Sequence, residues 1–177
     1  MGLSFLFRAL VSGGFFLAIL YGLPAQAGPV NLFEGQLEES TSNKRILLII
    51  DGDKITKFRL VDLEKISLYE TEVPAIWKGE EGKYQGVLLK DILSLAGITD
   101  AGTVRMVALD GYVIELDRKI WQSNCSFVAT RYQQQEITVE KKGPTRLLFP
   151  CLIKSPDYEE TPTSNWIWNL KEIHIEN

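Results

Sequence analysis

Residues 71–112 read TEVPAIWKGEEGKYQGVLLKDILSLAGITDAGTVRMVALDGY, and the organisation of this stretch decides the fold. Apolar residues recur at helical spacing over Val87–Ala96, and Gly97 stands where a C-cap glycine belongs. The proline, glycines and charges of residues 74–86 are typical of a loop. We therefore predict one prominent helix that follows a long loop.

Segments with strand-like patterns lie on both sides of this helix. Short apolar or alternating runs predict strands at 45–50, 55–60, 68–73, 103–109, 112–116, 125–131, 137–141, 146–150 and 167–176. Residues 61–67 and 117–121 predict a short helix and a helical turn. Because the strands come in runs and do not alternate with helices, we expect an α+β fold that is mainly β.

The first residues have the pattern of a secretory signal peptide. Arg8 precedes an apolar run at 9–23, and Ala-Gln-Ala follows at 25–27. A charged start, a short apolar core and a small-x-small exit predict cleavage after residue 27, which makes Gly28 the first residue of the mature chain. An uncleaved N-terminal anchor is the alternative. The expected location is the periplasm.

Residues 28–44 are polar and predict an exposed lead-in, whereas residues 45–177 have the length of one domain. The formal charge is -4 and no basic cluster suits a phosphate backbone, so nucleic acid is a poor candidate partner. The single histidine, His174, lies near the C-terminus and away from the candidate site. A zinc site or a catalytic triad needs a histidine with suitable partners, so the sequence favours neither.

Two cysteines, Cys125 and Cys151, lie in separate strand-like runs. In an oxidising compartment they could form a disulfide, and as buried thiols they would behave as small apolar residues. The sequence leaves both alternatives open. Neither cysteine belongs to a C-x-x-C motif, so disulfide exchange is not expected.

Five sequence elements, taken in order, resemble the oxidoreductase molybdopterin-binding domain, which has the sulfite-oxidase fold. Together they span most of the predicted mature chain. They are VDLEKI at 61–66, Trp77 with YQGVLLKDIL at 84–93, DGY at 110–112, KGPTRLLFP at 142–150 and WNLKEI at 168–173. The resemblance implies a sulfite-oxidase-like fold and a pterin-type cofactor.

The enzymatic branch of that family carries a cysteine thiolate on molybdenum just before its Trp-x-Gly region. Residues 68–77 contain no cysteine, and neither Thr71 nor Glu72 replaces a soft thiolate ligand. A second branch consists of small exported proteins that keep the fold and bind a free pterin. The chain resembles these in size, in the spacing from Thr71 to Trp77 and in Lys-Gly-Pro at 142–144, although it departs from their pattern at Arg146.

Some proteins of the second branch act on membrane enzymes that make or break cyclic di-GMP. The resemblance therefore implies an exported, non-catalytic pterin-binding protein that relays pterin status to the periplasmic domain of a membrane signalling protein. A molybdopterin-dependent oxidoreductase with an atypical metal ligand set is the alternative. Molybdenum is not expected, because the family cysteine is missing.

Three residues of the opening stretch are candidates for pterin binding. Trp77 could offer its ring for stacking, or could instead be a core anchor that pins the loop. Asp110 could accept hydrogen bonds from the N–H edge of the pterin, or could stabilise its own turn. Tyr112 could form a second aromatic wall or donate a hydroxyl, or could face the core.

Two cations complete the set of candidates. Arg146 could donate to the pterin carbonyl or to a side-chain hydroxyl, and Lys142 could contact an anionic tail. Both could equally be ordinary solvated charges. The other tryptophans, Trp121, Trp166 and Trp168, are expected in the core or at the rim, and the polar loop 155–165 could cap a pocket or contact a partner.

Overall fold

The computed structural model describes residues 30–74, 77–151 and 163–176. The predicted signal peptide at 1–27 and most of the loop at 155–165 lie outside the described residues. In the described part of the chain, no helix has both the length and the apolar composition needed to cross a membrane. The fold is α+β and mainly β, as the sequence predicted.

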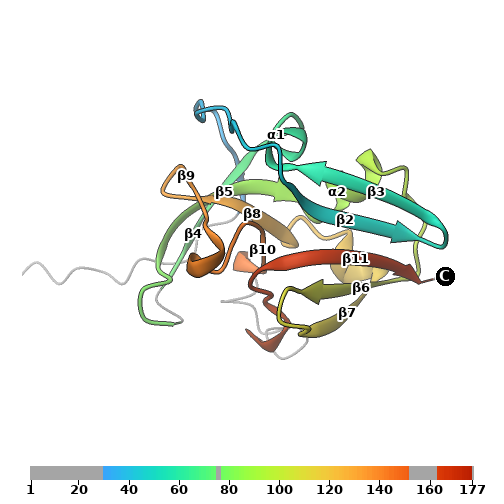
Figure 1. Cartoon of the computed structure of the whole chain (residues 1–177). Coiled ribbons are helices and arrows are strands. Elements are labelled where there is room, and N and C mark those ends of the chain that lie inside the picture. Colours follow the sequence, from blue (N-terminus) through green and yellow to red (C-terminus); the bar gives the residue numbers. More distant parts are fainter. Residues whose placement is uncertain (1–29, 75–76, 152–162, 177) are drawn as a thin grey trace, which may run out of the picture.

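Two sheets form the framework (Figure 1). The first has the strand order β1-β4-β5-β8-β10, with β9 paired to β8. Its strands are β1 (Asn31–Leu32), β4 (Tyr69–Val73), β5 (Gly82–Leu88), β8 (Phe127–Tyr132), β9 (Gln135–Glu136) and β10 (Arg146–Leu148). All of its pairings are antiparallel.

The second sheet has the order β3-β2-β11-β6-β7. Its strands are β2 (Arg45–Asp51), β3 (Lys54–Arg59), β6 (Thr103–Ala108), β7 (Val113–Asp117) and β11 (Leu170–Glu176). The C-terminal strand β11 lies between β2 and β6, and its pairing with β2 is the parallel one in this sheet (Figure 1). This strand therefore joins the first and the middle parts of the sequence.

Buried side chains of both sheets form one hydrophobic core with the helices. The α-helices are α1 (Leu60–Leu63), α2 (Leu89–Leu95) and α3 (Arg118–Trp121). The longest, α2, buries Leu89, Ile92 and Leu93, whereas Leu95 of the same predicted helix is 48% exposed. The helix begins two residues later than predicted, because Val87 and Leu88 pair with β8 as the end of β5.

The prediction of a loop at 74–86 is wrong for its last five residues, 82–86, which belong to β5. The glycines of this segment suggested a loop, but Gly86 permits the close pairing of β5 with β8. A Cβ at this position would lie only 2.1 Å from the carbonyl oxygen of Val128 in β8. The register between the two strands also shifts at Gln85 and Gly86. Only glycine allows the backbones to approach so closely.

The strand predicted at 137–141 is also wrong, because Val139–Lys141 is a turn of 3-10 helix. The chain reverses direction here, since the Gly143 amide donates to the Thr138 carbonyl at 2.8 Å. Lys142 takes a left-handed conformation with φ of 67°. The turn places the Lys142 side chain next to the elements that form the candidate site.

The predicted lead-in is largely exposed but is attached to the domain. Asn31 and Leu32 form β1 and pair with β4, and the Phe33 amide donates to the Leu68 carbonyl. Further along, the Glu38 carbonyl accepts a hydrogen bond from Arg131 at 3.0 Å. The segment therefore contacts both β4 and β8 of the first sheet before β2 begins.

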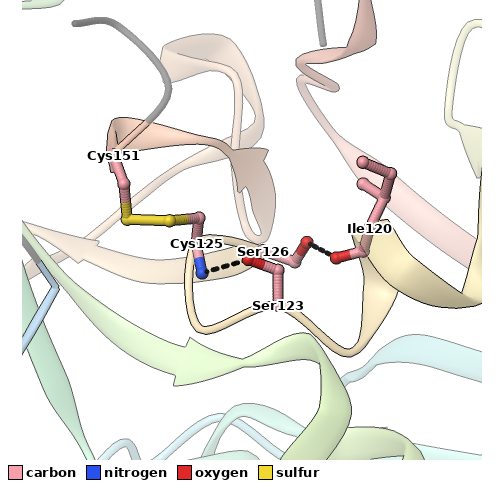
Figure 2. Close-up of a disulfide and its surroundings, with 5 residues drawn as sticks. All are labelled: Ile120, Ser123, Cys125, Ser126 and Cys151. Atoms are coloured by element: carbon pink, nitrogen blue, oxygen red, sulfur yellow. Dashed lines mark hydrogen bonds between the residues drawn. A yellow bond between two sulfur atoms is a disulfide. The ribbon is translucent and has the colours of Figure 1, made fainter. Parts of the chain in front are cut away.

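A disulfide joins Cys125 to Cys151, which settles the choice that the sequence left open (Figure 2). Cys125 lies in the tight turn between α3 and β8, where its amide donates to Ser123 Oγ. The Ser126 hydroxyl donates to the Ile120 carbonyl and closes the same turn. The disulfide therefore ties the start of β8 to the chain that follows β10.

A buried ion pair fixes α1 against the first sheet. Both carboxylate oxygens of Glu64 accept from Arg131, each at 2.7 Å, and the side chains are only 9% and 4% exposed. The Thr130 hydroxyl donates to the same carboxylate. Contact with Glu64 raises the pKa of Arg131, so the guanidinium keeps its charge.

We predict that Glu64→Ala destabilises the protein by about 3 kcal/mol, because it leaves the buried Arg131 guanidinium with only the more distant and exposed Glu136 carboxylate, 3.8 Å away, as an ion-pair partner. Urea denaturation followed by circular dichroism measures the change. Lys65→Ala is the matched control, because Lys65 is the next residue and is exposed. Equal stability of the two variants would show that the ion pair does not hold α1.

Candidate functional site

An aromatic pocket of about 250 Å³ opens where the loop after β4, the β6–β7 turn and the chain before β11 meet. We call it the aromatic pocket. Its lining residues are Trp77, Asp110, Tyr112, Ser164, Trp166 and Trp168. The predicted candidates Trp77, Asp110 and Tyr112 therefore lie in one pocket.

Three indole rings form the walls of the aromatic pocket. The Trp77 ring contacts the Trp166 ring edge-on, with centroids 5.4 Å apart and planes at 69°. It meets the Trp168 ring at 5.7 Å and 79°. Edge-to-face contacts of this kind hold aromatic rings in fixed orientations. Trp77 also packs against the core, so its roles as anchor and as pocket wall are compatible.

Asp110 and Tyr112 form the polar side of the aromatic pocket. The Asp110 carboxylate accepts from the Tyr112 amide at 3.0 Å, which is the turn-stabilising role that the sequence left open. The side chain remains exposed, and its second oxygen stays available to a ligand. The Tyr112 hydroxyl donates to the Ser164 carbonyl, and this bond links the β6–β7 turn to the wall before β11.

A second pocket, of about 370 Å³, contains the two predicted cations. We call it the charged pocket. It is lined by charged and aromatic side chains with Gly79, Gln135 and Ile137. The charged and aromatic residues are Glu80, Tyr84, Tyr132, Glu136, Glu140, Lys141, Lys142 and Arg146. The structure therefore separates Arg146 from the aromatic pocket.

Glu80 is the centre of the charged pocket. One of its carboxylate oxygens pairs with the Lys142 ammonium and the other with Arg146 Nη2. Glu80 is 8% exposed and Arg146 is 3% exposed, so this pairing is largely shielded from solvent. The single carboxylate therefore holds two cations, which are not the ordinary solvated charges of the alternative interpretation.

Tyr84 lies beneath these charges. Its hydroxyl donates to the Glu80 carbonyl at 3.0 Å and accepts from Arg146 Nη1 at 2.9 Å. Burial raises the pKa of Tyr84 to about 12, so the phenol is neutral at physiological pH. Its role is to orient the Arg146 guanidinium.

Lys142 connects the two pockets. Its ammonium lies 3.5 Å from the centre of the Trp168 ring, a cation–π contact, while it also pairs with Glu80. Trp168 lines the aromatic pocket and Lys142 lines the charged pocket. The two pockets therefore share a wall made of these two side chains.

The sequence analysis missed four residues of these pockets. Trp166 and Trp168 were expected in the core or at the rim, and Trp166 does belong to the core, but both also line the aromatic pocket. Glu80 and Tyr84 both fell in the predicted loop at 74–86, and no local pattern indicated their contacts with Lys142 and Arg146, which lie more than sixty positions away. That contact depends on the pairing of β5 with β8.

No cluster of histidine, cysteine and carboxylate side chains that could hold a metal ion was found among the described residues. Both cysteines of the chain are joined in the disulfide. A cysteine ligates a metal as its thiolate, so neither Cys125 nor Cys151 can do so while the disulfide is intact. Neither a protein-family model nor a curated protein matches the sequence.

Proposed function

We propose that the chain is an exported pterin-binding protein that holds the heterocycle in the aromatic pocket and performs no catalysis of its own. The observation that carries the proposal is that Trp77, Asp110 and Tyr112, which the family resemblance suggested as pterin contacts, line one pocket with two further tryptophans. The resemblance to the molybdopterin-binding domain supplies the pterin as the class of ligand.

The chemistry of the pocket supports a flat, polar heterocycle. Indole rings bind an electron-poor bicycle through stacking and edge contacts. The Asp110 carboxylate can accept hydrogen bonds from the amino group and ring N–H of a pterin. Pockets that bind drug-sized ligands measure about 300–1,000 Å³, so a smaller one suits a single compact ring system.

The cysteine chemistry supports binding without molybdenum catalysis. The enzymatic branch of the family uses a free thiolate near Trp77, where this chain has none. Cys125 and Cys151 are bound to each other, so neither offers a free thiolate. We therefore favour the binding protein over the oxidoreductase alternative.

We predict that Trp77→Ala weakens pterin binding by about tenfold or more, because stacking and burial on the indole are lost. Isothermal titration calorimetry with 6-hydroxymethylpterin, in oxidised and tetrahydro forms, measures the affinity. Trp77→Phe keeps an aromatic wall and should retain most of it. Ile55→Ala is the control, because Ile55 is an exposed apolar residue of β3, outside the pocket. The proposal fails if millimolar pterin gives no heat, or if Trp77→Ala binds as the wild type does.

Export to the periplasm is part of the proposal, and the disulfide supports it, because such bonds persist in oxidising compartments. Expression of the full chain in a bacterial host should yield a periplasmic protein that begins at Gly28. Intact mass measured with and without reduction, each followed by alkylation, gives both the N-terminus and the state of Cys125 and Cys151. A cytoplasmic protein with its first 27 residues and two free thiols would contradict this prediction.

We also propose that the pterin-bound form contacts the periplasmic domain of a membrane protein with a cyclic-di-GMP enzyme domain. The resemblance to the second branch of the family supports this step. The test first identifies whether a neighbouring gene encodes such a membrane protein, and then measures retention of this chain on its immobilised periplasmic domain. We expect retention of the pterin-loaded wild type and weaker retention of pterin-treated Trp77→Ala. Equal retention with and without pterin would contradict the relay.

A further inference from the structure

The rings of the aromatic pocket are arranged as a cage. The Trp77 ring lies at 69° to the Trp166 ring and at 79° to the Trp168 ring, so the indoles form steeply angled walls and not parallel plates. Tyr112 lines the same pocket and is 44% exposed. A flat ring system stacks on one wall, whereas a rounded group can contact several walls at once. The arrangement therefore also suits a compact, nearly spherical group.

The charge of the aromatic pocket favours a cation. Among the described residues that line it, Asp110 is the only one with a full charge, and its side chain is exposed. The aromatic rings add to this preference, because their faces carry partial negative charge. A cation in the pocket would therefore be attracted both by the ring faces and by the Asp110 carboxylate.

One ring of this group already binds a positive charge in the folded chain. The Lys142 ammonium lies 3.5 Å from the centre of the Trp168 ring. Lys142 lines the charged pocket and not the aromatic pocket, and its charge is paired with that of Glu80. The ammonium therefore occupies part of the Trp168 surface and leaves Trp77 and Tyr112 to a ligand.

The polar groups of the aromatic pocket favour one kind of cation. The Tyr112 hydroxyl already donates to the Ser164 carbonyl, and Asp110 Oδ1 accepts from the Tyr112 amide. A primary ammonium has three N–H donors and would find few acceptors for them here. A quaternary ammonium has no N–H donor, and its methyl groups can contact the indole faces directly. The lining therefore suits the quaternary group better.

We propose that the aromatic pocket is a binding site for a quaternary ammonium group, held by cation–π contacts with Trp77 and its neighbouring rings and by the charge of Asp110. The trimethylammonium group belongs either to a free solute such as choline or to a phosphatidylcholine headgroup. The support for this site is the ring geometry and the charge of the pocket, which are independent of the pterin. The two ligands would occupy the same space and exclude each other.

The first experiment compares choline with 3,3-dimethylbutanol, which has the same shape and no charge. Binding to the mature protein is followed by tryptophan fluorescence at constant ionic strength and checked by calorimetry. We expect choline to bind about tenfold more tightly, because cation–π and charge attraction act only on the cation. Ethanolamine, a primary ammonium, should bind more weakly than choline. Equal affinity for choline and its neutral analogue, or no saturable choline binding, would overturn the proposal.

Two variants test the two sources of attraction. Trp77→Leu keeps an apolar wall without an aromatic face, so choline affinity should fall about tenfold while affinity for the neutral analogue changes little. Equal losses for both probes would mean that Trp77 contributes only shape, and the proposal would fail.

Asp110→Asn removes the charge, and its amide oxygen can still accept from the Tyr112 amide. Choline affinity should fall about threefold, as expected for an exposed charge pair. Asp53→Asn is the matched control, because it removes the same charge from the exposed turn between β2 and β3. A loss of choline affinity in Asp53→Asn equal to that in Asp110→Asn would indicate general attraction to an acidic surface and would overturn the site.

The next experiment distinguishes the two sources of the ammonium group. The protein is sedimented with phosphatidylcholine vesicles and, as a control, with phosphatidylglycerol vesicles. Retention by phosphatidylcholine alone, reversed by free choline, assigns the group to a lipid headgroup. Choline binding without retention assigns it to a free solute. Retention by both vesicles that choline does not reverse would contradict the lipid source.

Competition between choline and 6-hydroxymethylpterin separates this site from the proposed function. If both bind, each should displace the other, because they share the walls of one pocket. Choline binding without pterin binding would overturn the proposed function and leave the quaternary ammonium site standing. Pterin binding without choline binding would overturn the quaternary ammonium site alone.

Discussion

The close pairing of β5 with β8 at Gly86 is the constraint on which the rest of this structure depends. The Val128 carbonyl approaches so closely that no side chain can be accommodated at this position. The pairing holds Glu80 and Tyr84 at one end of β5 and starts α2 at the other, where the Leu89 amide donates to the Ser126 carbonyl. The centre of the charged pocket and the longest helix are therefore positioned by one strand pair.

Glu80 links this strand pair to both pockets through its ion pairs. Its carboxylate orients Arg146 over Tyr84 and holds the Lys142 ammonium on the face of Trp168. Ion pairs in such a shielded place are strong only when each partner is well oriented. The Lys142 ammonium therefore connects the two pockets through its contacts with Glu80 and Trp168.

Local patterns predicted much of the fold because they report burial along a single element. The alternation in β6 and β7 and the helical spacing of Leu89, Ile92 and Leu93 follow directly from one buried face. The errors fell where tertiary contacts overrode composition. Glycines that resembled a loop belong to β5, and the run at 137–141 forms a turn, because the Gly143 amide bonds back to Thr138.

The sequence by itself determined the α+β class, the position of α2, and the grouping of Trp77, Asp110 and Tyr112 as candidates in one short stretch. Only the tertiary structure decided that Trp166 and Trp168 join them and that Cys125 bonds to Cys151. It also separated Arg146 from the aromatic pocket and paired it with Glu80. The physical reason is that burial of one face produces a periodic pattern of apolar residues along an element. Pairing between distant side chains depends on strand register and produces no local sequence pattern.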